Sequence, residues 1–280
     1  MLRLCATPIG NMEDITLRVL NALRDADEIW CEDTRHTLQL LNHFSIKKPL
    51  VSCHAHNEGE RVERLVAALQ ENREIVYVSD AGMPGISDPG AVLVRACVEH
   101  QLPYTVLPGA CAAVTAAVLS GLPCDDFTFF GFLPRSGRLR REAIQAVGAC
   151  GHLAILYESP HRVAETFSDL HDALGNREAA LCRELTKKFE TVVRGTLSSL
   201  AGTFQAEEPK GECVLLISSP HMEATEETAQ KQELTLDALL KELLSGGLST
   251  RDAAQEAALR LNVKKKVAYQ RALELQGGAS

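Results

Sequence analysis

The sequence predicts an α/β protein, with two α/β domains of similar size followed by a small helical domain. Three observations carry this prediction. Apolar runs of strand length alternate with helical patterns up to about residue 220, a polar stretch follows, and only helical patterns come after it. With 280 residues, 45% of them hydrophobic, the chain can build more than one core. We expect α/β domains at 1–112 and 113–220, a linker at 221–233 and a helical domain at 234–280.

The first domain alternates strand and helix without a break. Short apolar runs predict strands at residues 2–6, 28–31, 50–53, 75–78 and 104–107. Helical periodicity predicts helices at 13–26, 34–44, 57–70 and 89–100, the third of them capped by Asn57. Repeated β-α-β units predict a mostly parallel sheet with helices on both faces.

The second domain begins with an apolar helix at 112–119. Strands are expected at 127–132, 153–157, 179–182, 190–194 and 213–218, and helices at 138–147 and 163–174. From residue 179 onward the strands follow one another closely, which leaves little room for crossover helices. This spacing predicts a mixed sheet.

The end of the chain reads as a linker and a helical unit. Residues 221–233 are polar and rich in Glu and Thr. Beyond them, Gly246 and Gly247 should end a first helix, Ser249 should cap a second, and Asn262 should lie at the turn into a third. This pattern resembles a helix-turn-helix unit.

Composition excludes several classes of protein. None of the nine cysteines pair as C-x-x-C, so we expect reduced thiols in a cytoplasmic protein, with no metal. No apolar run reaches the ~20 residues of a membrane span, and the first residues show no signal-peptide pattern. A net charge of -8 means that any nucleic acid must be bound through local basic patches.

Three loops rich in glycine and proline follow predicted strands. They are "ATPIGN" (6–11), "SDAGMPGISDPG" (79–90) and "LPGACAAV" (107–114). The carboxyl ends of parallel strands meet at one edge of a sheet, where ligands bind in open α/β folds. The plain alternative is three β-α turns built from ordinary turn residues. Their shared edge favours a small-molecule site.

The loops narrow the class of ligand. Neither a P-loop nor a G-x-G-x-x-G motif occurs, so a nucleoside triphosphate or a dinucleotide is disfavoured. Glycine-rich loops without phosphate-binding signals suit an adenosine ligand that lacks a pyrophosphate. S-adenosylmethionine is one such ligand.

Eight motifs in fixed order carry a family resemblance. They are "TPIGN", "CEDTRHT", "VSDAGMPGISDPG", "LPGACA", "GFLPR", "YESPHR", "RELTKKFET" and "KGECVLLI". In this order they resemble the tetrapyrrole methylase superfamily, and within it the bacterial branch that methylates the ribose 2′-oxygen of a cytidine in small-subunit ribosomal RNA. The resemblance implies S-adenosylmethionine between two α/β domains, and a homodimer.

The resemblance also implies the residues that contact the methyl donor. They are Pro8, Gly10, Ser79, Asp80, Ala81, Gly82, Met83, Pro108, Ala112, Ala113, Tyr157, Gly211, Glu212 and Cys213. Met83 stands where this branch commonly has threonine, and Ala110-Cys111 replaces a more usual Pro or Ser pairing. The "TPIGN" loop replaces the glycine-proline-glycine turn of tetrapyrrole-modifying relatives, which favours the RNA branch.

The "CEDTRHT" loop is the candidate catalytic side. Glu32, Asp33, Arg35 and His36 crowd the end of a predicted strand, where a carboxylate or His36 could orient a ribose hydroxyl and Arg35 could hold a phosphate. The alternative is a helix start capped by Asp33 with Arg35 in solvent.

Basic residues are the candidates for RNA binding. They are Arg135, Arg162, Lys187, Lys188, Lys264, Lys265 and Lys266. The clusters "RSGRLRREA" (135–143) and "RELTKKFETVVR" (183–194) could meet phosphates, with a solvated helix face as the alternative. For the lysines of the tail, the alternative is a helical lid or a support for a dimer. Two other functions stay open: methylation of a small tetrapyrrole, and a non-enzymatic nucleic-acid regulator that acts through the helical tail.

Overall fold

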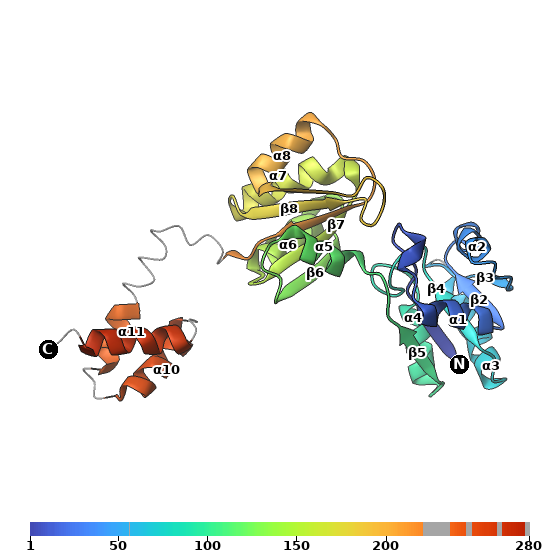
Figure 1. Cartoon of the computed structure of the whole chain (residues 1–280), viewed down its shortest axis with the longest axis horizontal. Coiled ribbons are helices and arrows are strands. Elements are labelled where there is room, and N and C mark those ends of the chain that lie inside the picture. The colour runs from blue at the N-terminus through green and yellow to red at the C-terminus, as the bar shows by residue number, and fades with distance from the viewer. Residues whose placement is uncertain (56, 221–235, 245–247, 262–264, 278–280) are drawn as a thin grey trace. The chain divides into compact units, whose positions relative to one another are not determined.

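The computed structural model describes residues 1–55, 57–220, 236–244, 248–261 and 265–277. The chain divides into two compact units, Met1–Pro220 and His221–Ser280, which we describe separately (Figure 1). The first unit contains two five-stranded sheets. Its expected division near residue 112 remains a proposal.

The first sheet is fully parallel, as the β-α-β pattern predicted, with strand order β3-β2-β4-β1-β5. Its strands are β1 (Leu2–Cys5), β2 (Glu28–Cys31), β3 (Leu50–Ser52), β4 (Ile75–Val78) and β5 (Tyr104–Leu107). Its helices are α1 (Leu17–Asp25), α2 (Thr34–His43), α3 (Glu58–Gln70) and α4 (Ala91–Glu99).

Side chains of the central strand β4 alternate between two cores. Ile75 and Tyr77 pack with residues of α3 and α4, whereas Val76 and Val78 pack with residues of α1 and α2. All four are fully buried. This two-sided burial explains why the strand is a continuous apolar run.

The second sheet is mixed, as its close strand spacing predicted. Its order is β6-β7-β10-β8-β9; β6 and β7 are parallel, and β10 is antiparallel to both β7 and β8. The strands are β6 (Phe127–Phe132), β7 (Leu153–Glu158), β8 (Glu178–Arg183), β9 (Thr191–Thr196) and β10 (Cys213–Ile217). The helices are α5 (Ala112–Ser120), α6 (Gly137–Ala149), α7 (Val163–Leu174) and α8 (Leu197–Ala206).

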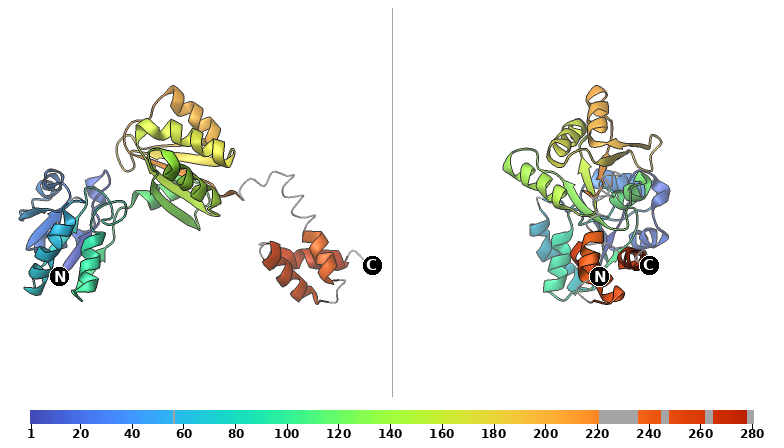
Figure 2. Two further views of the ribbon diagram at one scale, coloured as in Figure 1. Left: turned by 180° about the vertical axis from the view of Figure 1, so that it is seen from behind. Right: turned by 90° about the vertical axis from the view of Figure 1, so that its left-hand side faces the viewer.

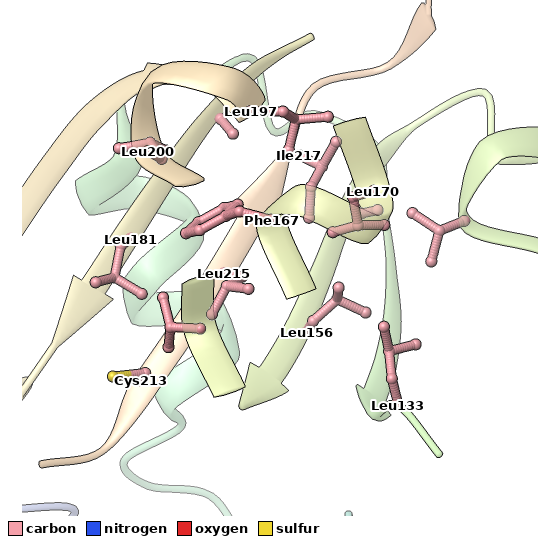
Figure 3. Close-up of a cluster of buried hydrophobic side chains, with 14 of the residues drawn as sticks. Leu133, Leu156, Phe167, Leu170, Leu181, Leu197, Leu200, Cys213, Leu215 and Ile217 are labelled. Atoms are coloured by element: carbon pink, nitrogen blue, oxygen red, sulfur yellow. The ribbon is translucent and has the colours of Figure 1, made fainter. Parts of the chain in front are cut away.

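Different helices cover the two faces of this sheet. Residues of α6, α7 and α8 form one core, in which Phe167 of α7 lies among Leu181, Leu215 and Leu200 (Figure 3). Small residues of α5 pack on the opposite face. Figure 2 shows α7 and α8 side by side from two further directions.

Two elements differ from the sequence prediction. The helix expected at 13–26 begins only at Leu17, because Thr16 caps it by accepting a hydrogen bond from Val19 N at 3.2 Å. Residues Met12–Asp14 form a separate 3-10 turn. Helix α8 was not predicted, although Thr196 and Ser199 begin it with reciprocal capping bonds.

The predicted cap of α3 also acts differently. Asn57 does not accept a hydrogen bond from its own helix among the described residues; its Oδ1 accepts from His54 N at 2.8 Å. The side chain therefore closes the loop that precedes the helix.

The second unit is helical. A helix over 236–244, α10 (Thr250–Leu261) and α11 (Lys265–Gly277) pack around small residues and leucines such as Leu240, Ala257 and Ala272. Ser249 caps α10 as predicted, accepting from Asp252 N at 3.2 Å. The expectations for Gly246, Gly247, Asn262 and Lys264 fall outside the described residues.

The structure bears on the expectations for cysteines, membrane spans and metal sites. All nine cysteines lie within residues 1–220 and are free thiols. Over the residues that the structure describes, no helix is long and apolar enough to cross a membrane, and no group of three or more His, Cys, Asp or Glu side chains could hold a metal ion.

Phe167 provides a test of the second core. It is fully buried and stacks on Phe204 at a centroid distance of 6.1 Å. We expect Phe167→Ala to lower the free energy of unfolding by about 3–5 kcal/mol, because the lost ring leaves a cavity. Urea unfolding measures this. The control is Phe189→Ala, whose ring is 65% exposed; equal losses in both variants would contradict the packing.

Candidate functional site

Backbone pairing joins the loops that follow β1 and β4. Thr7 N donates to Gly82 O at 2.9 Å, and Gly82 N donates to Thr7 O at 3.1 Å. Gly82 has φ +74°, a conformation that favours glycine. The Thr7 hydroxyl also donates to Ser79 O at 3.3 Å. The two loops therefore form one continuous surface at the carboxyl edge of the sheet.

A second glycine brings the same loop close to the sheet. Gly90 has φ +120°, and a Cβ built there would lie 2.7 Å from Cε1 of the buried Tyr77. Only glycine fits this approach, which sets where α4 begins.

A cavity of about 340 Å³ lies against these loops. Its walls come from the loop after β4, the first residue of α5, the end of β7 and the start of β10. Eight of the predicted donor contacts line it: Ala81, Gly82, Met83, Ala112, Tyr157, Gly211, Glu212 and Cys213. The structure thus brings together residues from distant motifs of the sequence.

The walls are largely apolar, with few titratable groups. Burial raises the pKa of Tyr157 to about 12, so its hydroxyl stays protonated; the Ala113 N–H also donates to that hydroxyl. Burial raises the pKa of the Cys213 thiol to about 12 as well. Neither group supplies a nucleophile at neutral pH.

Asp88 is a carboxylate in the wall of the larger cavity, and the charges of Glu32 and Asp80, which lie outside that wall, act on it. Burial, aided by the charge of Glu32, raises the pKa of Asp88 to about 6. Burial and the charge of Asp80 also raise the pKa of Glu32. A cluster of negative groups at an apolar wall favours a cationic ligand there.

A smaller cavity of about 230 Å³ shares Ile9, Ala81 and Glu212 with the larger one. Four more predicted donor contacts line it, Pro8, Gly10, Ser79 and Asp80. Predicted catalytic His36 and predicted RNA-binding Lys187 do so as well. Sequence reasoning treated these six as parts of three separate functions, whereas the structure brings them to one cavity.

The remaining candidate catalytic residues line neither of these two cavities. Asp33 caps α2, accepting from Arg35 N at 2.8 Å, and also pairs with the guanidinium of Arg35 at 2.6 Å. Hydrogen bonds from Arg35 hold the pKa of Asp33 down at about 2. Asp80 accepts from Asp33 N at 3.1 Å. Glu32, Asp33 and Arg35 thus shape the end of β2, beside the cavities.

Other predicted residues are placed as follows. Pro108 is exposed, and Ala113 is buried behind Tyr157. Arg135 lies in a separate hollow at the start of α6. Lys188 is exposed over the Phe189 ring, and Lys265 and Lys266 are exposed at the start of α11.

Arg140 corrects one interpretation of the sequence. The cluster "RSGRLRREA" was expected to face phosphates or solvent, but the Arg140 side chain is only 6% exposed. It donates to Asp169 at 2.7 Å and to Thr166 Oγ1 at 3.0 Å, and Thr166 in turn donates to Glu158 at 2.7 Å. This buried chain of bonds fixes Glu158 in the wall of the larger cavity.

Sequence reasoning missed several wall residues. Ile9, Ile86, Ser87, Asp88, Cys111 and Phe132 line the larger cavity but were not among the donor contacts. Asp88 could have been found from the sequence, because it is the second aspartate of the loop "SDAGMPGISDPG". Phe132 lies in the "GFLPR" motif; pairing of β6 with β7 sets it beside Tyr157, and the two rings make an edge contact at 5.6 Å.

Comparisons with known proteins agree with this architecture. A family model described as tetrapyrrole (corrin/porphyrin) methylases matches residues 1–201, and one described as RsmI C-terminal HTH domain matches 230–276. Crystal structures with a similar fold include diphthine synthase (TM-score 0.61, 17% identity, 78% of this chain and 90% of that chain). Uroporphyrin-III-C-methyltransferase from Thermus thermophilus is another (TM-score 0.54, 20% identity, 78% and 94%).

Sequence relatives extend over nearly the whole chain. The protein named "Ribosomal RNA small subunit methyltransferase I" from Escherichia coli O157:H7 is 44% identical over 97% of this chain and 94% of its own length. Its namesake from Halalkalibacterium halodurans is 41% identical over 96% and 93%. The fold is thus of the tetrapyrrole methylase type. The chain belongs to the tetrapyrrole methylase family, and to its branch whose members carry that ribosomal RNA methyltransferase name.

Asp88 should make the free energy of unfolding depend on pH. Its pKa of about 6 lies above the unfolded value, so the folded state binds more protons and stability falls as pH rises from about 4 to 6. We expect Asp88→Asn to match the wild type near pH 4 and to exceed its free energy of unfolding by roughly 1–3 kcal/mol at pH 7.5.

Urea unfolding at both pH values measures this difference. Asp125→Asn, at an exposed position of the same unit, is the control and should leave the pH profile unchanged. Parallel profiles for wild type and Asp88→Asn would contradict the raised pKa.

Proposed function

We propose that this chain transfers a methyl group from S-adenosylmethionine to the ribose 2′-oxygen of a cytidine in small-subunit ribosomal RNA. Relatives named for methylation of that RNA, 41–44% identical over nearly the full length, support the substrate class. The ordered motifs of the sequence support the ribose position. The proposal includes a cytoplasmic homodimer, and the first substrate to test is ribosomal RNA within the assembled small subunit.

The observation that carries the proposal is the larger cavity. Its volume of about 340 Å³ falls at the lower end of small-molecule sites. Apolar walls from Met83 and Tyr157 suit the flat adenine and the methylene groups of the donor, and the carboxylates at its side suit the positive sulfonium. The residues present therefore fit S-adenosylmethionine.

The donor, when bound, supplies an activated methyl group on a sulfonium. The chain's own part is to bind this donor, to align an acceptor oxygen in line with the carbon–sulfur bond, and to exclude water. Rigid walls serve that purpose. Glu158 is fixed by Thr166, Arg140 and the N–H of Ser159, and Gly82 is fixed by Thr7.

The RNA that accepts the methyl group has to be bound through cationic side chains, although the protein as a whole is acidic. We propose that Arg135, Arg162, Lys187, Lys188 and the Lys264–Lys266 cluster contact RNA, because the net charge of -8 disfavours general attraction to phosphates. Arg162 already pairs with Glu158 at 3.4 Å, so its contact would come through a side chain held in place. Local patches of this kind suit a folded RNA substrate.

A methyl-transfer assay tests the activity. We expect the chain to move label from S-adenosylmethionine onto isolated small subunits that lack the modification, and nucleoside mapping to find 2′-O-methylcytidine. Naked small-subunit RNA and a corrin are the comparison acceptors. Label on a base, or on the corrin alone, would contradict the proposal.

Filling the larger cavity tests the donor site. Ala112 lies in its wall at the first turn of α5. We expect Ala112→Phe to weaken S-adenosylmethionine binding at least tenfold in calorimetry, because the ring occupies donor space. Val118→Phe is the matched control on the same helix, where the side chain is 71% exposed. Unchanged affinity in Ala112→Phe would place the donor elsewhere.

A further inference from the structure

The smaller cavity is the feature that the donor does not explain. It shares Ile9, Ala81 and Glu212 with the larger cavity, so the two are neighbours. Direct transfer between two substrates requires that their sites meet at the transferred group. Adjacent cavities with a common wall satisfy this requirement.

One cation is built into the wall of the smaller cavity. Lys187 Nζ lies 3.0 Å from Glu184 Oε1 and 3.0 Å from Glu212 Oε2. An ammonium has three N–H donors, and these two bonds use two of them. Its charge is secure: burial acts to lower the pKa of Lys187, but the bonds to Glu184 and Glu212 outweigh burial and raise it.

The backbone around Lys187 adopts an uncommon conformation. Glu184 has φ 51° and Thr186 has φ 64°, both in the left-handed region that non-glycine residues seldom occupy. Such residues persist where their surroundings hold them, and they cluster at functional sites. Here the hydrogen bond from Glu212 N to Glu184 Oε1 at 3.1 Å ties the loop to the start of β10.

Gly10 makes room for the lysine stem. A Cβ built on Gly10 would lie 2.5 Å from Lys187 Cγ and 2.8 Å from Leu185 O. The "TPIGN" loop can therefore pass under Lys187 only with glycine at this position. Gly10, the loop around Lys187 and the carboxylates of Glu184 and Glu212 together fix the position of the Lys187 ammonium group.

We propose that the smaller cavity holds the acceptor nucleoside and that the Lys187 ammonium stabilises the negative charge developing on its 2′-oxygen. This inference rests on the proposed function. A preorganised cation beside a developing oxyanion lowers the barrier of the step it faces. Apolar Met12 and Leu40 offer surfaces for a flat base, and Asp80, Ser79 and His36 offer groups for its polar edge.

The step balances without a further reactant. A lone pair of the 2′-oxygen forms the new bond to the methyl carbon as the carbon–sulfur bond breaks, and that electron pair returns to sulfur. The sulfonium becomes a neutral thioether, and the hydroxyl proton passes to water. Lys187 keeps its own protons throughout and acts by its charge.

Nearby cations are less suited to this role. The guanidinium of Arg35 is 88% exposed and bound to Asp33, and neither residue lines the cavity among the described wall residues. Lys188 is exposed and lies 5.6 Å from the centroid of the Phe189 ring. Lys47 is a matched control: it is the same residue type, it is exposed, and it lies outside both cavity walls and outside the proposed RNA contacts.

The test compares Lys187→Met with Lys47→Met. Single-turnover methyl transfer to isolated small subunits gives the rate, and calorimetry gives the affinity for S-adenosylmethionine. We expect Lys187→Met to lose about 100-fold or more in rate, with donor affinity within twofold of wild type. Lys47→Met should keep the wild-type rate at saturating subunit concentration.

Other outcomes overturn the inference in distinguishable ways. Equal rates for the two variants would remove Lys187 from the chemistry, and a large loss of donor affinity in Lys187→Met would assign the smaller cavity to the donor. Wild-type chain that methylates no ribose would overturn the proposed function itself. Lys187→Gln, which keeps N–H donors for Glu184 and Glu212 but loses the charge, serves if Lys187→Met does not fold; it should be at least tenfold slower than Lys47→Met, and an equal rate would contradict the inference.

Discussion

The site depends on the pairing between Thr7 and Gly82. Two backbone hydrogen bonds, at 2.9 and 3.1 Å, hold the loop after β1 against the loop after β4. Because β1 and β4 are neighbours in a parallel sheet, their ends already lie close together. The pairing converts this proximity into a fixed wall, and both cavities use it through Ile9 and Ala81.

Burial and charge are divided between the two cavities in a way that suits methyl transfer. The larger cavity has apolar walls with Asp88 at its side, a group whose pKa of about 6 reflects burial near other carboxylates. The smaller one has a lysine fixed between Glu184 and Glu212. Negative charge beside a sulfonium and positive charge beside a developing alkoxide are the arrangement that the proposed reaction needs.

Much of the fold followed from the sequence, because local patterns determine it. The apolar run 75–78 is a strand buried on both faces, and its neighbours in the β-α-β pattern form the parallel sheet. Helix α8 was missed because it follows β9 directly, and its signal is a capping pair at Thr196 and Ser199. The late start of α1 has a similar cause, a cap at Thr16.

The candidate site was harder to predict, because it depends on contacts between distant motifs. The predicted parallel strands place the loops at one edge of the sheet. Side-chain packing divides the space at that edge into two cavities, and Asp80 and Gly10 line the smaller one. The sequence also could not show that Arg140 of a basic cluster is buried against Thr166 and Asp169. Met83, which the family resemblance singled out as a departure, lines the larger cavity and contributes an apolar surface there.

A crystal structure of the chain with S-adenosylhomocysteine bound would test the central claim most directly. The account predicts that the product occupies the cavity lined by Met83, Ala112 and Tyr157, with its sulfur toward the wall shared through Ile9, Ala81 and Glu212. The cavity beside Lys187 would then remain free for the acceptor. Product bound in that smaller cavity, or outside both, would contradict the account.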